Sequence, residues 1–240
     1  MVDHLGHALV VDPGEAMPVQ QVLQRKGLVL DAIVVTHHHA DHIGGVAELR
    51  QATSAVVYGP AREDIPGPFE PVSEGMGIKL LGLEWQVLDV PGHTAGHVAF
   101  WTPDFNGEPL LFCGDTLFSA GCGRIFEGTA AQLYHSLQKL AALPAHALVC
   151  CTHEYTLSNL RFALAVEPGN AALQKHFQHC TQLRDNGGMT LPSRMSLELD
   201  INPFLRTHIP AVQNAARARD PNARTEQDIF AALRAWKNVF

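Results

Sequence analysis

Residue types that bind metal ions crowd the segment Thr36-His37-His38-His39-Ala40-Asp41-His42. Imidazole nitrogens and carboxylate oxygens are natural ligands of Zn²⁺ and related ions. His37 and His39 are two residues apart, and this spacing places both side chains on one side of an extended segment. Asp41 and His42 follow at the expected start of a helix, from which they can turn towards a second ion. The segment therefore predicts a metal site.

Further ligand types occur where predicted strands end. Short apolar runs closed by turn-forming residues predict strands at 7–11, 32–35, 56–58, 85–90, 97–102, 110–113 and 148–151. His37, His93, Asp115 and His153 each come directly after such a run, and ligands gather at strand ends in layered sheet folds. With the first segment, this gives seven ligands, which are too many for one tetrahedral ion and suit two. Asp115 is the only carboxylate among the distant ligands, so it is the candidate bridge.

Most of the other histidines are expected to have no metal-binding role. His38 lies between two proposed ligands and should point away from the metal, and His97 is expected to support the site or to begin a strand. The histidines expected to lie elsewhere on the protein are His4, His7, His135, His146, His176, His179 and His208.

Helical patterns dominate the last third of the chain. Helices are predicted at 16–24, 42–50, 156–166, 170–184, 211–219 and 225–237, and one more begins after Thr129, a typical N-cap residue. Strand signals nearly vanish after His153, which predicts a soft boundary near 155–166. We therefore expect a catalytic domain over 1–160 and a helical domain over 161–240.

Longer motifs identify a family. The first segment, together with Pro91-Gly92-His93-Thr94, Gly114-Asp115 and His153, resembles the metallo-β-lactamase superfamily. Within it, LFCGDTLFSAGCGRIFEG (111–128) and CTHEYTLSNL (151–160) are similar to glyoxalase II, the hydroxyacylglutathione hydrolases. The resemblance implies an α+β fold: a four-layer αββα sandwich followed by a small C-terminal helical domain.

The resemblance also divides the ligands between two divalent ions. It assigns His37, His39 and His93 to one ion and Asp41, His42 and His153 to the other, with Asp115 bridging them. Zn²⁺ is the first expectation, while iron and manganese also suit such ligands.

The reaction that the resemblance implies is thioester hydrolysis. S-D-lactoylglutathione, or another S-(2-hydroxyacyl)glutathione, would be cleaved by a metal-bridging hydroxide, with Asp41 and Asp115 as catalytic residues. The products would be glutathione and a 2-hydroxy acid, here D-lactate, in the second step of methylglyoxal detoxification.

The family binds glutathione through three segments. Carried onto this chain, the substrate-binding residues are Arg124, Phe126, His153, Tyr155, Arg234 and Lys237. Phe126 stands where some members have tyrosine, so a phenol hydrogen bond is lost and only a backbone contact would survive. In the last helix Ile229, Leu233, Trp236 and Phe240 form an apolar stripe, and Arg234 and Lys237 are neighbours on another face. On this basis Arg234→Ala should mainly raise KM.

Composition limits the partners and the location of the protein. The net charge of −7 opposes a nucleic-acid partner, because phosphate binding needs a basic surface. Five cysteines without a regular framework predict free thiols in a reducing compartment. The sequence has no signal-peptide pattern and no membrane-spanning run, so we expect a cytoplasmic monomer with no membrane partner.

Only eleven residues precede Asp12, fewer than in relatives, which predicts an exposed sheet edge there.

Other functions fit parts of the pattern. A mononuclear iron oxygenase acting on glutathione persulfide would need only two histidines and a carboxylate. A β-lactamase or lactonase would not explain the glutathione segments, and an RNA-processing nuclease would need a basic surface. A non-catalytic metal-binding protein would show no thioesterase activity.

Overall fold

The computed structural model describes residues 1–3 and 5–240, so His4 lies outside the described residues. The chain forms two compact units, and each is described by itself. Unit 1 comprises Met1–Asp89 and Ala95–Gly114; unit 2 comprises Val90–Thr94 and Asp115–Phe240.

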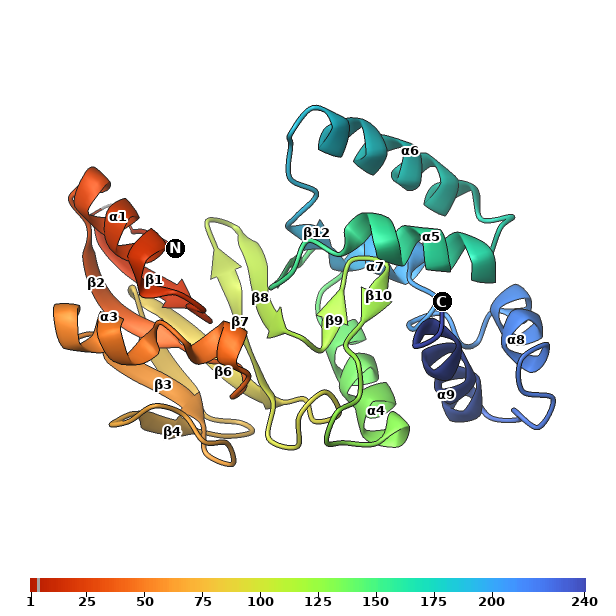
Figure 1. The fold of residues 1–240 in the computed structure, drawn as a ribbon, viewed down its shortest axis with the longest axis horizontal. Helices are drawn as coiled ribbons and strands as arrows, with labels where there is room; N and C mark the ends of the chain where they lie inside the picture. The colour runs from red at the N-terminus through yellow and green to blue at the C-terminus, as the bar shows by residue number, and fades with distance from the viewer. Residues whose placement is uncertain (4) are drawn as a thin grey trace. The chain divides into compact units, whose positions relative to one another are not determined.

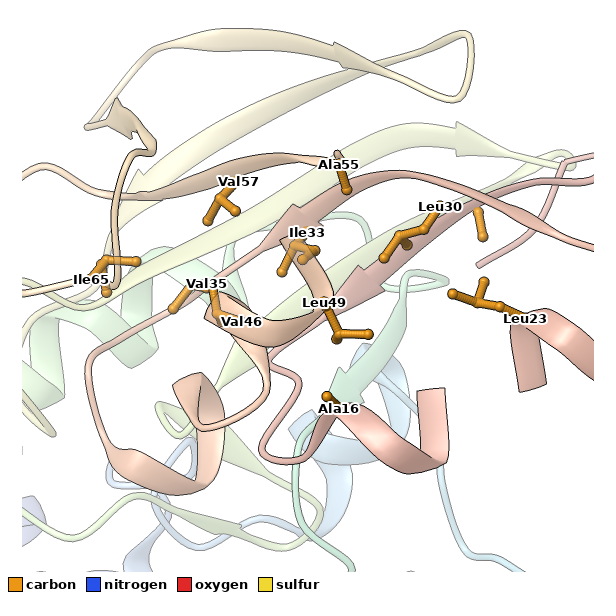
Figure 2. Close-up of a cluster of buried hydrophobic side chains, with 11 residues drawn as sticks. Ala16, Leu23, Leu30, Ile33, Val35, Val46, Leu49, Ala55, Val57 and Ile65 are labelled. Carbon is orange, nitrogen blue, oxygen red and sulfur yellow. The ribbon is translucent and has the colours of Figure 1, made fainter. Parts of the chain in front are cut away.

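Unit 1 contains a parallel sheet whose strands run in chain order. These are β1 (His7–Val11), β2 (Val29–Val34), β3 (Val56–Pro60) and β4 (Glu70–Val72). Helices α1 (Ala16–Lys26) and α3 (Val46–Thr53) lie against one face of it (Figure 1). Figure 2 shows the apolar side chains of helices and strands converging there. Burying each valine, leucine or isoleucine side chain stabilises the fold by roughly 1.5–3 kcal/mol, so this layer holds the ends of β1 and β2 in place.

The second sheet of unit 1 is an antiparallel meander. Its strands are β5 (Gly77–Leu80), β6 (Leu83–Asp89), β7 (Val98–Phe105) and β8 (Glu108–Gly114). Trp85 of β6 and Phe112 of β8 stack with ring centroids 5.1 Å apart. The alternation of buried and exposed residues along β5 and β6 is typical of a sheet with one face in the core.

The predicted helix over 42–50 is wrong as a single element. The structure has α2 (Ala40–Ile43) and α3 separated by Gly44 and Gly45. A Cβ atom on either glycine would collide with backbone atoms of Gly14 or Glu15. The glycine pair thus lets the chain pass close to the turn after β1, and it frees Asp41 and His42 from the direction of α3.

Unit 2 is mainly helical. It contains the short hairpin β9 (Leu117–Phe118) and β10 (Gly121–Cys122), and the antiparallel pair β11 (Leu148–Cys151) and β12 (Ser193–Arg194). Its helices are α4 (Ala130–Ala141), α5 (Thr156–Val166), α6 (Ala171–Asp185), α7 (Met195–Ile201), α8 (Pro210–Arg217) and α9 (Glu226–Lys237).

The helix starts in unit 2 follow from their capping residues. Thr129 with Gln132, and Thr225 with Asp228, form capping boxes that satisfy the first amide groups of α4 and α9. Over both units, six helices and seven strands predicted from the sequence are confirmed, with ends shifted by a few residues. The two-residue strands and α7 were too short to give a periodic signal.

An ion pair and an apolar cluster hold the helices of unit 2 together. Glu167 accepts two hydrogen bonds from Arg206, of 2.8 and 2.9 Å. Helices α5, α6 and α7 share a buried cluster that includes Leu160, Leu173 and Ile201. Among the described residues, none of the helices has the length and apolar character that crossing a bilayer requires.

Candidate metal centre

His37 and His39 lie just beyond the end of β2 in unit 1. Nε2 of His37 is 3.0 Å from Nδ1 of His39, and the ring of His37 is fully buried. Two ligand atoms about 2.0–2.1 Å from one tetrahedral ion lie about 3.4 Å apart. The pair is therefore close to the separation that two ligands of one ion require.

Asp12, at the end of β1, organises this part of unit 1. Its two carboxylate oxygens accept hydrogen bonds from the backbone N–H of Thr36 at 2.7 Å and from the Thr36 hydroxyl at 2.8 Å. Because that hydroxyl donates to Asp12, its oxygen accepts from Nδ1–H of His37, at 3.0 Å. Nε2 of His37 is then the unprotonated nitrogen, which is the form that binds a metal.

Asp12 orients His42 as well. Oδ2 of Asp12 is 3.1 Å from Nδ1 of His42, and Nε2 of His42 lies 3.7 Å from Oδ2 of Asp41. A carboxylate this close to one imidazole nitrogen favours a proton on that nitrogen, which leaves the other nitrogen as the metal ligand. Sequence reasoning missed Asp12, although it follows a strand like the proposed ligands.

His38 and His97 have partners that fit their expected roles. Glu63 is 2.7 Å from Nδ1 of His38 and also accepts from the backbone N–H groups of His38 and Gly96. The ring of His97 stacks on His37, with centroids 4.7 Å apart and an interplanar angle of 20°. This stack fits the first of the two roles expected of His97, support of the site.

In unit 2, Asp115 lies between two imidazoles. Its Oδ2 is 3.4 Å from Nε2 of His93, and its Oδ1 is 3.5 Å from Nε2 of His153. Each distance matches the roughly 3.4 Å separation of two ligands on one tetrahedral ion. Because a different oxygen faces each histidine, the carboxylate has the arrangement of a bridge between two ions.

The protonation state of His93 fits a ligand. Its Nδ1 is 2.7 Å from the carbonyl oxygen of Arg124, which can only accept, so Nδ1 carries the proton. Nε2 is left unprotonated towards Asp115. Gly123 is required beside this group, since a Cβ there would collide with the Asp115 carbonyl oxygen. The donor sets of both units therefore fit divalent metal ions.

The aromatic residues predicted to contact substrate are exposed. Tyr155 is half-exposed and stacks on His153, with ring centroids 4.9 Å apart at 20°. Phe126 is also exposed, with the Arg124 guanidinium 5.5 Å from its ring centroid. The backbone of Phe126 was expected to keep a substrate contact although the residue lacks a phenol hydroxyl. In the structure the Phe126 N–H donates to the His93 carbonyl oxygen at 3.1 Å.

Arg234 is buried, unlike a residue on a solvated basic face. Its Nη1 donates to the carbonyl oxygens of Cys122 and Gly123 at 3.0 and 3.3 Å, and its guanidinium lies 5.3 Å from the Phe204 ring centroid. A buried guanidinium needs such partners. Arg234 therefore supports the backbone before Arg124.

Lys237 is half-buried one turn further along α9. Its Nζ donates to the Ser158 carbonyl at 3.3 Å and lies 5.1 Å from the ring of Phe162. Burial, reinforced by the charge of Arg234, lowers the pKa of Lys237 to about 8. Its charge is therefore sensitive to pH in the mildly alkaline range.

Comparisons with known proteins agree with this description. The family model "Metallo-beta-lactamase superfamily" matches residues 1–153, and "Hydroxyacylglutathione hydrolase C-terminus" matches residues 154–240. A hydroxyacylglutathione hydrolase of Albidiferax ferrireducens is 58% identical over 240 residues, covering 100% of this chain and 94% of that protein.

Two solved structures are similar in fold. ETHE1 from Myxococcus xanthus has a TM-score of 0.65 at 25% identity, covering 100% of this chain and 92% of its own. TTHA1623 in a di-iron-bound form has a TM-score of 0.51 at 35% identity, covering 60% of this chain and 80% of its own. The predicted α+β metallo-β-lactamase fold with a helical C-terminal domain is confirmed. The chain belongs to the hydroxyacylglutathione hydrolase family of the metallo-β-lactamase superfamily.

Proposed function

We propose that this enzyme hydrolyses the thioester of S-(2-hydroxyacyl)glutathione, with S-D-lactoylglutathione as the preferred substrate. The observation that carries the proposal is Asp115, whose two oxygens face His93 and His153 separately. Membership of the hydroxyacylglutathione hydrolase family supports the same reaction. The enzyme would then act in the second step of methylglyoxal detoxification.

We propose that seven residues together bind two divalent ions. His37, His39 and His93 would hold one ion, Asp41, His42 and His153 would hold the other, and Asp115 would be shared between them. When bound, such ions lower the pKa of water from its bulk value towards about 7 and polarise a carbonyl oxygen. Zn²⁺ is the first expectation, and the di-iron form of TTHA1623 supports iron as an alternative.

The protein residues would orient the reactants and need to supply little acid. Asp41 is exposed and can accept a hydrogen bond from the attacking water. The leaving thiolate has a pKa near 8.5 on the reference scale, so it departs without a strong general acid. Tyr155, Phe126 and Arg124 are exposed and can contact the peptide of glutathione, and Lys237 can pair with one of its carboxylates.

The domain boundary, location and assembly stay predictions. We propose a catalytic domain over 1–160 and a helical, substrate-binding domain over 161–240. A cytoplasmic monomer with no nucleic-acid or membrane partner is what we expect.

We expect KM to rise with pH as Lys237 loses its proton. A group with a pKa of about 8 is fully charged well below that pH, and only about one tenth charged at pH 9. If the charged form binds a glutathione carboxylate, KM should be roughly tenfold higher at pH 9 than at pH 7. Steady-state kinetics between pH 6.5 and 9.5 would measure this.

The matched control is Lys237→Arg, because arginine stays protonated throughout this range. Its KM should lack the alkaline rise, whereas titration of substrate groups would affect both proteins equally. An identical rise in wild type and variant would show that Lys237 does not contact the substrate carboxylate.

The proposed reaction is tested by assaying the purified enzyme on S-D-lactoylglutathione. We expect release of free thiol with no oxygen uptake, and much weaker activity on lactoyl thioesters that lack the glutathione carboxylates. Oxygen consumption with glutathione persulfide would favour the mononuclear iron oxygenase. Hydrolysis of a β-lactam or lactone at a higher kcat/KM would favour those activities, and tight metal binding without turnover would favour a non-catalytic role.

A further inference from the structure

The hairpin β9–β10 in unit 2 is held by side chains from three helices. In each of the six consecutive residues from Phe118 to Gly123, one backbone group is hydrogen-bonded to a buried polar side chain. The side chains are Asn159 of α5, Glu198 of α7, Asn202 at the end of α7, and Arg234 of α9. An isolated hairpin of this length would not be stable in water, so these contacts fix its position.

Glu198 and Asn202 form the centre of this arrangement. Both are fully buried. Oε2 of Glu198 accepts from the Ala120 N–H at 2.7 Å and from Nδ2 of Asn202 at 3.1 Å. The same Nδ2 lies 3.1 Å from the Phe118 carbonyl oxygen and 2.9 Å from that of Gly121.

The contact at Ala120 falls where the backbone is strained. Ala120 has a φ of 53°, in the left-handed region that residues with a side chain rarely adopt. A backbone held in this region needs support from its surroundings. Glu198 supplies that support by accepting the N–H of the same residue.

Two further side chains hold the flanks of the hairpin. Nδ2 of Asn159 donates to the Ser119 carbonyl at 3.1 Å, and its side chain lies so close to Gly121 that no Cβ would fit there. Arg234 donates to the carbonyls of Cys122 and Gly123. The hairpin is therefore fixed from three separate helices.

The hairpin connects two parts of the proposed active site. It begins after Asp115 and ends before Arg124, whose carbonyl oxygen accepts from His93 Nδ1. The Gly123 N–H returns to the Thr116 carbonyl at 3.1 Å, next to Asp115. A displacement of the hairpin would move the bridging carboxylate and the partner that sets the tautomer of His93.

We propose that Glu198, Asn202 and Asn159 are positioning residues that let the helical region set the geometry of Asp115 and His93 through the β9–β10 hairpin. In this account α5 and α7 act on the metal ligands without touching substrate. The inference rests on the proposed function for its kinetic consequences, but its effects on metal affinity and on the hairpin amides do not require turnover.

The test compares Glu198→Gln with wild type in the metal-loaded enzyme. Glutamine keeps the size of the side chain but replaces one oxygen with an NH2 group. The side chain can then no longer accept at both positions to which the Ala120 N–H, Asn202 Nδ2 and the Ser193 hydroxyl now donate. We expect kcat to fall about tenfold and metal affinity to fall by about 10- to 100-fold, the range for lost partners of metal ligands. Amide hydrogen exchange over 118–123 should become faster.

A matched control separates positioning from a general loss of stability. Glu167→Gln also removes a buried carboxylate with a strong partner, Arg206, but the other side chain that donates to Glu167 in the described part of the chain is Asn170, outside the hairpin. It should lower the thermal midpoint while kcat, metal affinity and exchange over 118–123 stay as in wild type. A change in these three readouts in both variants would contradict a positioning role.

Asn159→Asp provides a second variant, which keeps the test available if Glu198→Gln does not fold. It replaces the donor to the Ser119 carbonyl with an oxygen at nearly constant volume. We expect the same direction of change in metal affinity and exchange. Wild-type kcat, metal affinity and hairpin exchange in a folded Glu198→Gln or Asn159→Asp enzyme would overturn the proposal, whereas a wild type without thioesterase activity would overturn only the proposed function.

Discussion

Replacing Asp115 by alanine is expected to remove nearly all turnover together with bound metal. The carboxylate faces both His93 and His153, at 3.4 and 3.5 Å. Without it, the ion proposed for His37, His39 and His93 would have no carboxylate ligand, and two positive ions would lose the negative charge between them. The loss should exceed the roughly 10- to 100-fold that follows when a residue merely orients a ligand.

The measurement is metal content after dialysis, paired with kcat on the same sample. Asp185→Ala is a suitable control, because Asp185 is an exposed carboxylate at the end of α6 in the same unit. It should keep wild-type metal content and activity. Full activity in Asp115→Ala would rule out the bridging role.

Asp12→Asn is expected to have the second-largest effect, although Asp12 is not a proposed ligand. The buried carboxylate accepts from the Thr36 N–H and hydroxyl and lies 3.1 Å from His42 Nδ1. Asparagine can accept at only one atom and would direct an N–H at another donor. We expect metal affinity to fall about 10- to 100-fold and the free energy of unfolding to fall by about 1–3 kcal/mol.

Metal titration and chemical denaturation of the variant would measure the two effects. Asp31→Asn provides a matched control in unit 1, because Asp31 also pairs with a histidine, His7, at 2.8 Å, but both side chains are exposed. Such a surface pair contributes about 0–1 kcal/mol. Equal, small effects in both variants would mean that Asp12 does not orient the metal ligands.

The strand-end positions of the proposed ligands were predictable because their signal is local. His37, Asp115 and His153 each follow an apolar run, and the run itself marks the strand end that positions them. The capping residue Thr129 likewise indicated the start of α4 from a few neighbouring residues. Fold class followed from these patterns together with the family motifs.

Features that depend on distant contacts were not predictable in this way. The role of Asp12 depends on Thr36 and His42, which the sequence does not link to it. In the sequence, the apolar stripe of the last helix places Arg234 on a different face. In the structure Arg234 is buried as well, because it donates to the carbonyl oxygen of Cys122, more than a hundred residues earlier in the chain. The interruption between helices α2 and α3 at Gly44 and Gly45 follows from the close approach of Gly44 to the backbone of Gly14. No periodic pattern in the sequence reveals this approach.

The central claim is that seven residues bind two metal ions and that both ions are needed for thioester hydrolysis. The direct measurement is to titrate the metal-free enzyme with Zn²⁺ while recording bound metal and S-D-lactoylglutathione hydrolysis on the same sample. The account predicts saturation at two ions per chain, with turnover rising until the second ion is bound. Full turnover with a single bound ion per chain would contradict it.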